Sequence, residues 1–227
     1  GLTYTLETWC EKKGIPMDSL TLAVQGFGNV GSVGALLMHR EGVKVIAIGD
    51  IDGSLYNPKG IDVEAAYVYA NSHGRSLKGY EEEGASFIPN EELLKLPVDV
   101  LFMAALENQL HAGTMEGVQA KVILEGANGP TTEEADDYFE KKGIEVLPDV
   151  MSNVGGVVGS YYEWVQNKTG LYWTEAEYNE RLKRNMRQSF EDVDAIRKEY
   201  GVTYRLAAYM LALKRVVEAQ NMRGFLG

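Results

Sequence analysis

The sequence predicts an α/β fold in which a doubly wound, mostly parallel sheet is followed by additional C-terminal helices. Between residues 20 and 150, short runs rich in β-branched residues alternate with helical patterns, which is typical of parallel strands joined by helices. The first of these runs leads directly into a glycine-rich turn and a helix. From Gly155 onward, apolar residues recur every three or four positions, as they do on amphipathic helices.

The most informative segment is 20–31, LTLAVQGFGNVG, where an apolar strand runs into three glycines. In this pattern Gly26 allows a tight turn, Gly28 lets the backbone approach a pyrophosphate, and Gly31 lets the next helix pack closely on the strand. The diphosphate would then lie against free N–H groups at the helix N-terminus. The segment therefore predicts a dinucleotide site on a Rossmann-type sheet.

An acidic residue follows the second predicted strand, 43–49, where such folds hold the adenosine ribose. Asp50 ends VKVIAIGD and is expected to accept hydrogen bonds from the ribose hydroxyls. Its carboxylate, with Asp52 two positions on, would repel a 2′-phosphate, although Asp52 alone is interpreted as a turn residue. No arginine lies in this loop, and its nearest cation is Lys59. NAD is therefore the predicted cofactor, in preference to NADP.

The next elements follow from periodicity and turn residues. Helices are predicted over 30–41 and 61–73, and the turn-rich DGSLYNPKG before the second helix is interpreted as an excursion. Further strands are predicted in VDVLFMAA, AKVILEG and IEVLPDV. Thr131 and Glu134 have the spacing of a capping box, for a helix that Gly143 closes.

Three helices complete the prediction. They cover GGVVGSYYEWVQN, a long stretch through 178–200, and a last stretch through 206–217. Their apolar stripes are interpreted as core or interdomain packing faces. We expect residues 1–227 to form one NAD-binding domain, on which the helices of 174–227 pack.

Polar residues follow three of the strands, at the sheet edge where open α/β sheets bind ligands. Ala104 and Ala105 are small enough for a nucleotide to lie close, and Asn108 and Gln109 offer amide donors after them. In the next loop Asn128 follows a compact turn, and after the last strand Asn153 precedes paired glycines. Each asparagine alone is typical of a turn or cap. Together they predict a nicotinamide half-site.

Composition excludes several classes of partner. With 22 basic and 33 acidic residues, the net charge of −11 argues against nucleic acid or an anionic membrane surface. No apolar run approaches the length that spans a bilayer. The single cysteine, Cys10, excludes an internal disulfide and favours a reducing, cytoplasmic location. The chain opens in helical periodicity without an initiator Met, which predicts a piece of a longer protein.

Five segments in this order resemble the nucleotide-binding, C-terminal half of the hexameric glutamate dehydrogenases, within the glutamate, leucine, phenylalanine and valine dehydrogenase superfamily. They are GFGNVG, AALENQL, LEGANGPTT, PDVMSNVGGV and SYYEW, and the resemblance covers essentially the whole chain. It implies an oxidative deamination, in which NAD takes a hydride from L-glutamate and the imine is hydrolysed to 2-oxoglutarate and ammonia.

The resemblance also implies roles for particular residues. The pyrophosphate would be bound by Phe27, Gly28, Asn29 and Val30, the adenosine ribose region by Asp50 and Ile51, and the ribose and nicotinamide side by Ala104, Ala105, Gln109 and Asn128. Asn153 would lie beside the nicotinamide ribose and the substrate. Val157 and Ser160 would shape the substrate pocket, with the Ser160 hydroxyl donating to the γ-carboxylate of glutamate.

The same resemblance places the catalytic lysine and aspartate in a separate N-terminal substrate domain, which we expect to be absent from this chain. We therefore assign no catalytic residue and no metal ligand in this chain, and we expect it to bind NAD but not to turn over glutamate alone. Its partners would be L-glutamate or 2-oxoglutarate together with the missing domain. The intact protein would be a homohexamer, and a monomeric fragment is compatible with the sequence.

Two alternatives stay open. One is a non-catalytic NAD-binding or redox-sensing module, which would bind the cofactor without a catalytic lysine. Val157 and Ser160 argue against it, because a sensor needs no glutamate pocket. The other is a related amino-acid dehydrogenase with a different side-chain specificity.

Overall fold

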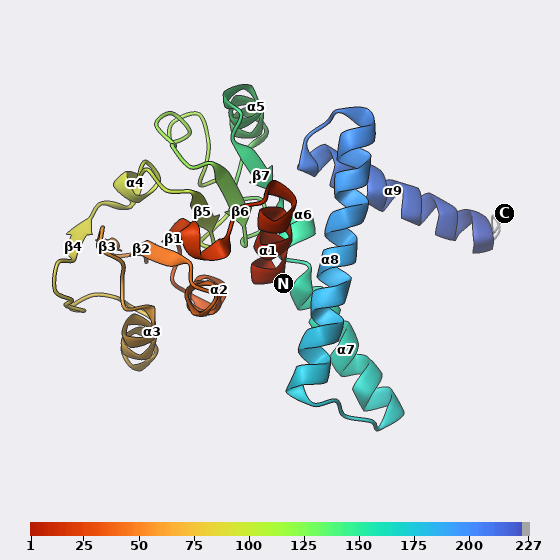
Figure 1. Ribbon diagram of the computed structural model, residues 1–227, viewed down its shortest axis with the longest axis horizontal. Coiled ribbons are helices and arrows are strands. Elements are labelled where there is room, and N and C mark those ends of the chain that lie inside the picture. The colour runs from red at the N-terminus through yellow and green to blue at the C-terminus, as the bar shows by residue number, and fades with distance from the viewer. Residues whose placement is uncertain (224–227) are drawn as a thin grey trace.

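A seven-stranded sheet forms the centre of the computed structural model, which describes residues 1–223 (Figure 1). The strand order is β4-β3-β2-β1-β5-β6-β7. The parallel strands are β1 (Thr21–Gln25), β2 (Lys44–Gly49), β5 (Val100–Met103), β6 (Val122–Glu125) and β7 (Glu145–Leu147). Two short strands, β3 (Ser54–Tyr56) and β4 (Ser86–Ile88), continue the sheet in antiparallel pairing. The predicted mostly parallel sheet is confirmed.

Helices cover both faces of this sheet, because alternate strand residues point to opposite sides. Leu22, Val24 and Phe102 pack on one face with α1 (Leu2–Lys13), α2 (Asn29–Arg40) and α3 (Val63–Ser72). Ala23 and Leu101 pack on the other face with α4 (Asn90–Leu93) and α5 (Glu133–Lys142). Figure 1 shows α5 and α2 on opposite sides of the strands. The sheet is doubly wound, as predicted.

The chain between β2 and β5 is more regular than its turn-rich sequence suggests. The excursion holds β3, and the segment after α3 holds β4 and α4. The hydroxyl of Ser54 donates to Oδ1 of Asn90 at 2.6 Å, which ties β3 to α4. Strands of three residues are too short to show an alternating pattern, so periodicity could not reveal them. A one-turn helix, α6 (Asp149–Ser152), lies in the loop predicted after β7, and it is also too short for periodicity to reveal.

The capping box predicted at Thr131 and Glu134 is wrong by one residue. Thr132 caps α5, accepting from the amide of Ala135 at 3.3 Å, and no partner for the buried Thr131 hydroxyl occurs among residues 1–223. A complete capping box instead starts α8 (Glu175–Tyr200), where Thr174 and Glu177 bond reciprocally.

Three helices follow the sheet: α7 (Gly155–Thr169), α8 and α9 (Tyr204–Arg223). Phe190 of α8 and Tyr204 of α9 are buried in the core on the α1 side of the sheet. Met186 and Tyr162 form a separate small cluster between α8 and α7. Residues 224–227 of the predicted C-terminal helices lie outside the described residues. No helix described in 1–223 is both long and apolar enough to cross a membrane.

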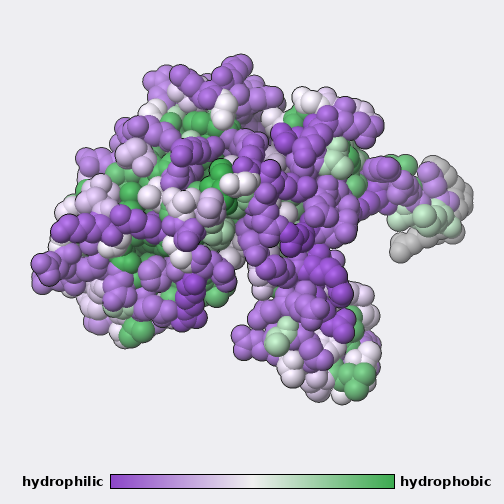
Figure 2. All heavy atoms as spheres, in the orientation of Figure 1, coloured by the Kyte–Doolittle hydropathy of each residue, from purple (hydrophilic) through white to green (hydrophobic). Residues whose placement is uncertain are grey.

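Parts of the predicted apolar stripes are uncovered. The α8 stripe is buried at four positions, Leu182, Met186, Phe190 and Val193. By contrast Leu206 and Leu213 of α9 are half or more exposed, and α7 exposes Tyr161 and Trp164. Pale and green residues at the lower end of Figure 2 mark the α7 region. These stripes are therefore not all core faces of this chain.

Candidate functional site

The glycine turn at the carboxyl end of β1 leaves no room for side chains at two of its positions. Gly26 has φ +96°, and a Cβ there would lie 2.6 Å from the carbonyl carbon of Ala104. A Cβ on Gly31 would lie 1.7 Å from the carbonyl oxygen of Gly26. Both distances are far below van der Waals contact. The tight turn and the close approach of α2 to the strand are therefore both present.

The middle glycine faces open space. Apart from Gly28 itself and its two neighbours in the chain, no heavy atom of the described residues lies within 4 Å of the Cβ position of Gly28, which precedes α2. No side chain of residues 1–223 caps α2, and its first backbone bond runs from Ser32 N to Gly28 O at 2.9 Å. The amides before Ser32 therefore point out of the helix end, where a phosphate can accept from them. The Phe27 side chain is buried in the core, so its backbone is the part near this opening.

At the end of β2, the carboxylate of Asp50 organises two backbone segments. Its Oδ1 accepts from the amide of Asp52 at 2.8 Å and its Oδ2 accepts from the amide of Leu77 at 2.5 Å. Each carboxylate oxygen has a second acceptor site, so a ribose hydroxyl can still bind. Ile51 beside it is 94% exposed.

Arg75 is a cation at this position that the sequence analysis missed. It has φ +67°, and its guanidinium donates to Oδ1 of Asn29 at the start of α2. Its neighbour Ser76 donates to Asp52 Oδ2 at 3.0 Å. Lys59, the cation of the loop after β2, lies elsewhere. It lines a hollow with Lys44 at the start of β2, at the opposite edge of the sheet.

The loops after β5 and β6 meet beside the glycine turn. Asn108, which has φ +53°, donates through its backbone N–H to the carbonyl of Gly129 at 2.8 Å. The side chain of Gln109 accepts from Gln25 Nε2 at 3.0 Å. An open cavity of about 400 Å³ lies between the two loops. It is lined by Ala105, Leu106, Glu107, Gln109, Ala127 and Asn128.

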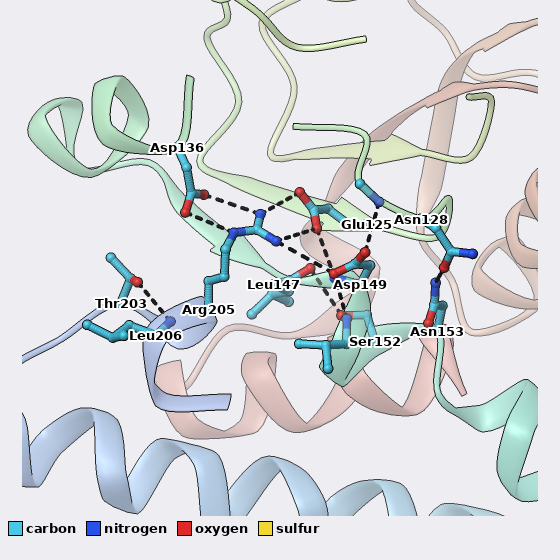
Figure 3. Close-up of polar contacts among 12 residues, drawn as sticks. Glu125, Asn128, Asp136, Leu147, Asp149, Ser152, Asn153, Thr203, Arg205 and Leu206 are labelled. Atoms are coloured by element: carbon cyan, nitrogen blue, oxygen red, sulfur yellow. Dashed lines mark hydrogen bonds and ion pairs between the residues drawn. The ribbon is translucent and has the colours of Figure 1, made fainter. Parts of the chain in front are cut away.

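The third predicted loop joins the same region through Asn153, the residue after α6. Its Nδ2 donates to Oδ1 of Asn128 at 2.7 Å and to the carbonyl of Gly126 at 3.2 Å (Figure 3). A Cβ on Gly126 would lie 3.1 Å from Val30 Cγ1, which places this loop against the start of α2. The structure therefore brings the glycine turn and the three polar loops to one edge of the sheet.

The two residues expected to shape a substrate pocket lie one turn apart on α7. Val157 is 70% exposed, and the exposed Ser160 hydroxyl donates to the carbonyl of Gly156 at 3.2 Å. A serine on a helix commonly makes such a bond, and its oxygen still has acceptor capacity. Within residues 1–223 this face of α7 forms one open wall, not an enclosed pocket.

Another cavity, of about 410 Å³, lies between α5, β7 and the turn from α8 to α9. It opens at Glu145, at the amino end of β7, and is also lined by Asp136 and Arg205. Glu145 is paired there with Lys13 at 2.8 Å. Open α/β sheets bind ligands at the carboxyl ends, so this cavity is not the dinucleotide site. Residues 1–223 also contain no group of three or more His, Cys, Asp and Glu residues placed to hold a metal ion.

Known proteins with this sequence pattern are dehydrogenases. Residues 1–224 match the model of the Glutamate/Leucine/Phenylalanine/Valine dehydrogenase family. The chain is 46% identical to a glutamate dehydrogenase of Thermotoga maritima over 93% of this chain and 50% of that protein. It is 45% identical to an NADP-specific glutamate dehydrogenase of Synechocystis sp. and 40% identical to a catabolic NAD-specific one of Bacillus subtilis. The Synechocystis and Bacillus matches each cover 99% of this chain. They cover 54% of the Synechocystis protein and 52% of the Bacillus protein.

A solved structure agrees with these matches. The hetero-hexameric glutamate dehydrogenase of Thermus thermophilus, in its leucine-bound form, superposes with a TM-score of 0.90 at 32% identity. The match covers 99% of this chain and 52% of that one. The chain thus spans about half the length of the curated relatives it matches. With the fold, the glycine turn and the family model in agreement, the chain belongs to the Glutamate/Leucine/Phenylalanine/Valine dehydrogenase family.

Proposed function

We propose that this chain is the cofactor-binding half of an NAD-dependent glutamate dehydrogenase, which converts L-glutamate, NAD and water to 2-oxoglutarate, ammonia and NADH. The observation that supports it most is the shared sheet edge, where the open turn at Gly28 meets the loops of Asn128 and Asn153. A dinucleotide laid along that edge has its phosphates at the N-terminus of α2 and its nicotinamide towards Asn153. The cofactor, when bound, accepts the hydride.

Glutamate is the proposed substrate because the relatives of 40–46% identity are named glutamate dehydrogenases. On this chain the substrate side would consist of Val157 and Ser160, whose hydroxyl can turn to the γ-carboxylate. The acid and base would come from the other half of the protein, so this half alone is proposed to be inactive. The intact enzyme would be a cytoplasmic homohexamer.

NAD is the proposed preferred cofactor, although the named relatives include both NAD-specific and NADP-specific enzymes. Asp50 and Asp52 place two carboxylates beside the ribose position, and a 2′-phosphate there would be repelled. Arg75 offsets part of that repulsion, because its positively charged guanidinium lies beside the ribose position, where it bonds to Asn29. We therefore expect NADH to bind more tightly than NADPH, with the difference reduced by Arg75.

The test combines binding with complementation. NADH and NADPH are titrated into the 227-residue chain and followed by cofactor fluorescence, and we expect the dissociation constant for NADH to be lower. The N-terminal half of a glutamate dehydrogenase is then added, and glutamate-dependent NADH production is recorded against a sample without this chain. If this chain binds NADH but no combination produces it, the redox-sensing alternative is favoured. If neither cofactor binds, the proposal is wrong.

A further inference from the structure

A cluster of ion pairs behind the nicotinamide-side loops centres on Arg205, near the start of α9 (Figure 3). Its guanidinium donates to both carboxylate oxygens of Glu125, at 2.7 and 3.2 Å. Its Nε donates to Asp136 Oδ2 at 2.9 Å, and its Nη1 lies 3.6 Å from Asp149 Oδ1. One cation therefore connects the last residue of β6 with α5 and α6.

The carboxylates around Arg205 also hold the backbone of the loops. Glu125 Oε2 accepts from the amide of Asp149 at 2.8 Å, and Asp149 Oδ2 accepts from the amide of Gly129 at 2.8 Å. The carbonyl of Gly129 then accepts from the amide of Asn108. A continuous set of polar contacts thus runs from α9 to both loops that line the 400 Å³ cavity.

Arg205 stabilises the charged form of the buried Glu125 carboxylate. The Glu125 side chain is fully buried, and burial raises its pKa, while the hydrogen bonds and charge of Arg205 act in the opposite direction. Without Arg205, the buried carboxylate would take up a proton or draw in water. Either change would weaken the acceptor that holds the amide of Asp149 and, through it, the turn at Gly129.

Attachment of α9 to the rest of the molecule does not depend on these ion pairs alone. Tyr204, Ala207 and Ala208 are all buried in the main core, where they pack with Phe190 of α8. Arg205 contacts a different set of residues, the three carboxylates of Glu125, Asp136 and Asp149. Two of its partners, Glu125 and Asp149, bond in turn to the backbone that leads to the cofactor loops, whereas Asp136 ties it to α5.

We propose that Arg205 is a positioning residue for the nicotinamide half of the cofactor site, acting through Glu125 and Asp149 on the loops at 108 and 129. This inference rests on the proposed cofactor function. It assigns to the C-terminal helix a role in the site although Arg205 itself lies behind the loops. The adenosine side, at Gly28 and Asp50, has no contact with this cluster among the bonds described for residues 1–223.

The experiment compares two probes in the 227-residue chain. NADH carries the nicotinamide riboside, whereas ADP carries only adenosine and the two phosphates. For Arg205→Met we expect the dissociation constant of NADH to rise about tenfold, the equivalent of one charge-assisted hydrogen bond, while that of ADP changes less than about twofold. Arg205→Lys keeps a cation but loses the paired geometry, so it should recover part of the NADH affinity.

Arg215→Met is the matched control, because it removes an exposed arginine of the same helix that pairs with Asp192. We expect it to leave both dissociation constants unchanged. Equal losses for NADH and ADP, or no loss for NADH, in Arg205→Met would overturn the inference. If that variant does not fold, the same comparison is made with Arg205→Lys, and unchanged NADH binding there overturns it. A wild-type chain that binds neither probe would instead refute the proposed function.

Discussion

The two halves of the candidate cofactor site are held in different ways. On the adenosine side, the turn from β1 to α2 is fixed by backbone packing, with Gly31 pressed against the carbonyl of Gly26. On the nicotinamide side, the Gly129 amide donates to Asp149 and the Gly126 carbonyl accepts from Asn153, while Glu125 and Asp149 form ion pairs with Arg205 behind the loop. The turn of the first half is fixed mainly by steric contacts of backbone, to which the Asp50 carboxylate adds polar contacts nearby, whereas the second half is polar throughout.

This difference predicts how each half responds to mutation. A steric turn has no alternative packing, so adding one carbon to it disturbs the fold as well as the site. A polar network has several members, and removing one leaves the others in place. The free energy lost then depends on how deeply the removed group is buried. Fold stability should therefore follow the adenosine side, and the affinity difference between NADH and ADP should follow the nicotinamide side.

The largest effect is expected from Gly31→Ala. Because its Cβ would lie 1.7 Å from the Gly26 carbonyl oxygen, α2 must move off the strand. We expect unfolding free energy, measured with urea, to fall by about 3 kcal/mol, the upper part of the range for overpacking. Binding of both NADH and ADP should be lost. Unchanged stability would contradict the steric account of this half.

Gly28→Ala separates binding from folding at the same turn. Its Cβ position has open space around it and its φ of −76° suits any residue, so the fold should tolerate alanine. We expect a stability loss below about 1 kcal/mol, the cost of a poorer helix cap. The new methyl group would occupy the approach of the phosphates, and NADH and ADP should both bind at least about tenfold more weakly. Calorimetric titration with each ligand checks this, and full retention of ADP binding would contradict it.

Asn153→Ala removes one member of the polar half. The substitution breaks the bonds to Asn128 Oδ1 and to the carbonyl of Gly126. Since Asn128 is exposed and can bond to water instead, we expect a loss of about fivefold in NADH affinity, close to the value of one neutral hydrogen bond. ADP binding and urea stability should stay near wild type. A parallel loss of ADP affinity would show that the two halves are not independent.

Most of the fold follows from the sequence, because each long buried strand has a continuous apolar run. The apolar runs that end before Gly26, Asp50 and Gly126 form β1, β2 and β6, respectively. β3 and β4 did not follow from it, since three residues carry no measurable period. The cap of α5 was predicted one residue early because Thr131 has a glutamate, Glu134, three positions on, whereas Thr132 caps the helix without one, its third following residue being Ala135.

The site was predictable to the extent that its contacts are local. Three glycines in six positions define the turn, whereas Arg205 meets a residue 80 positions away and Arg75 one 46 positions away. An arginine that binds several carboxylates cannot be told from an exposed surface arginine in a sequence, because the fold decides which residues become its partners. Glu125 carried a signal that was not used: a carboxylate that ends a buried apolar strand requires a cation or several donors.

The smallest effect, and the one that sharpens the adenosine side most, is expected from Arg75→Asn. Asparagine tolerates the positive φ of this position, so the loop at 75–77 should keep its bond to Asp50. If Arg75 offsets the repulsion of a 2′-phosphate by Asp50 and Asp52, NADPH should bind about threefold more weakly at low salt, and the loss should shrink as salt screens it. NADH binding should not change. Lys59→Asn, at the other edge of the sheet, is the matched control and should affect the binding of neither cofactor.

Equal losses for NADH and NADPH in Arg75→Asn would instead mean that Arg75, beside Asn29, binds the pyrophosphate that both cofactors share. In that case a second side chain besides Asp50 serves the adenosine half, and the contrast with the nicotinamide half is narrower than the glycine contacts suggest.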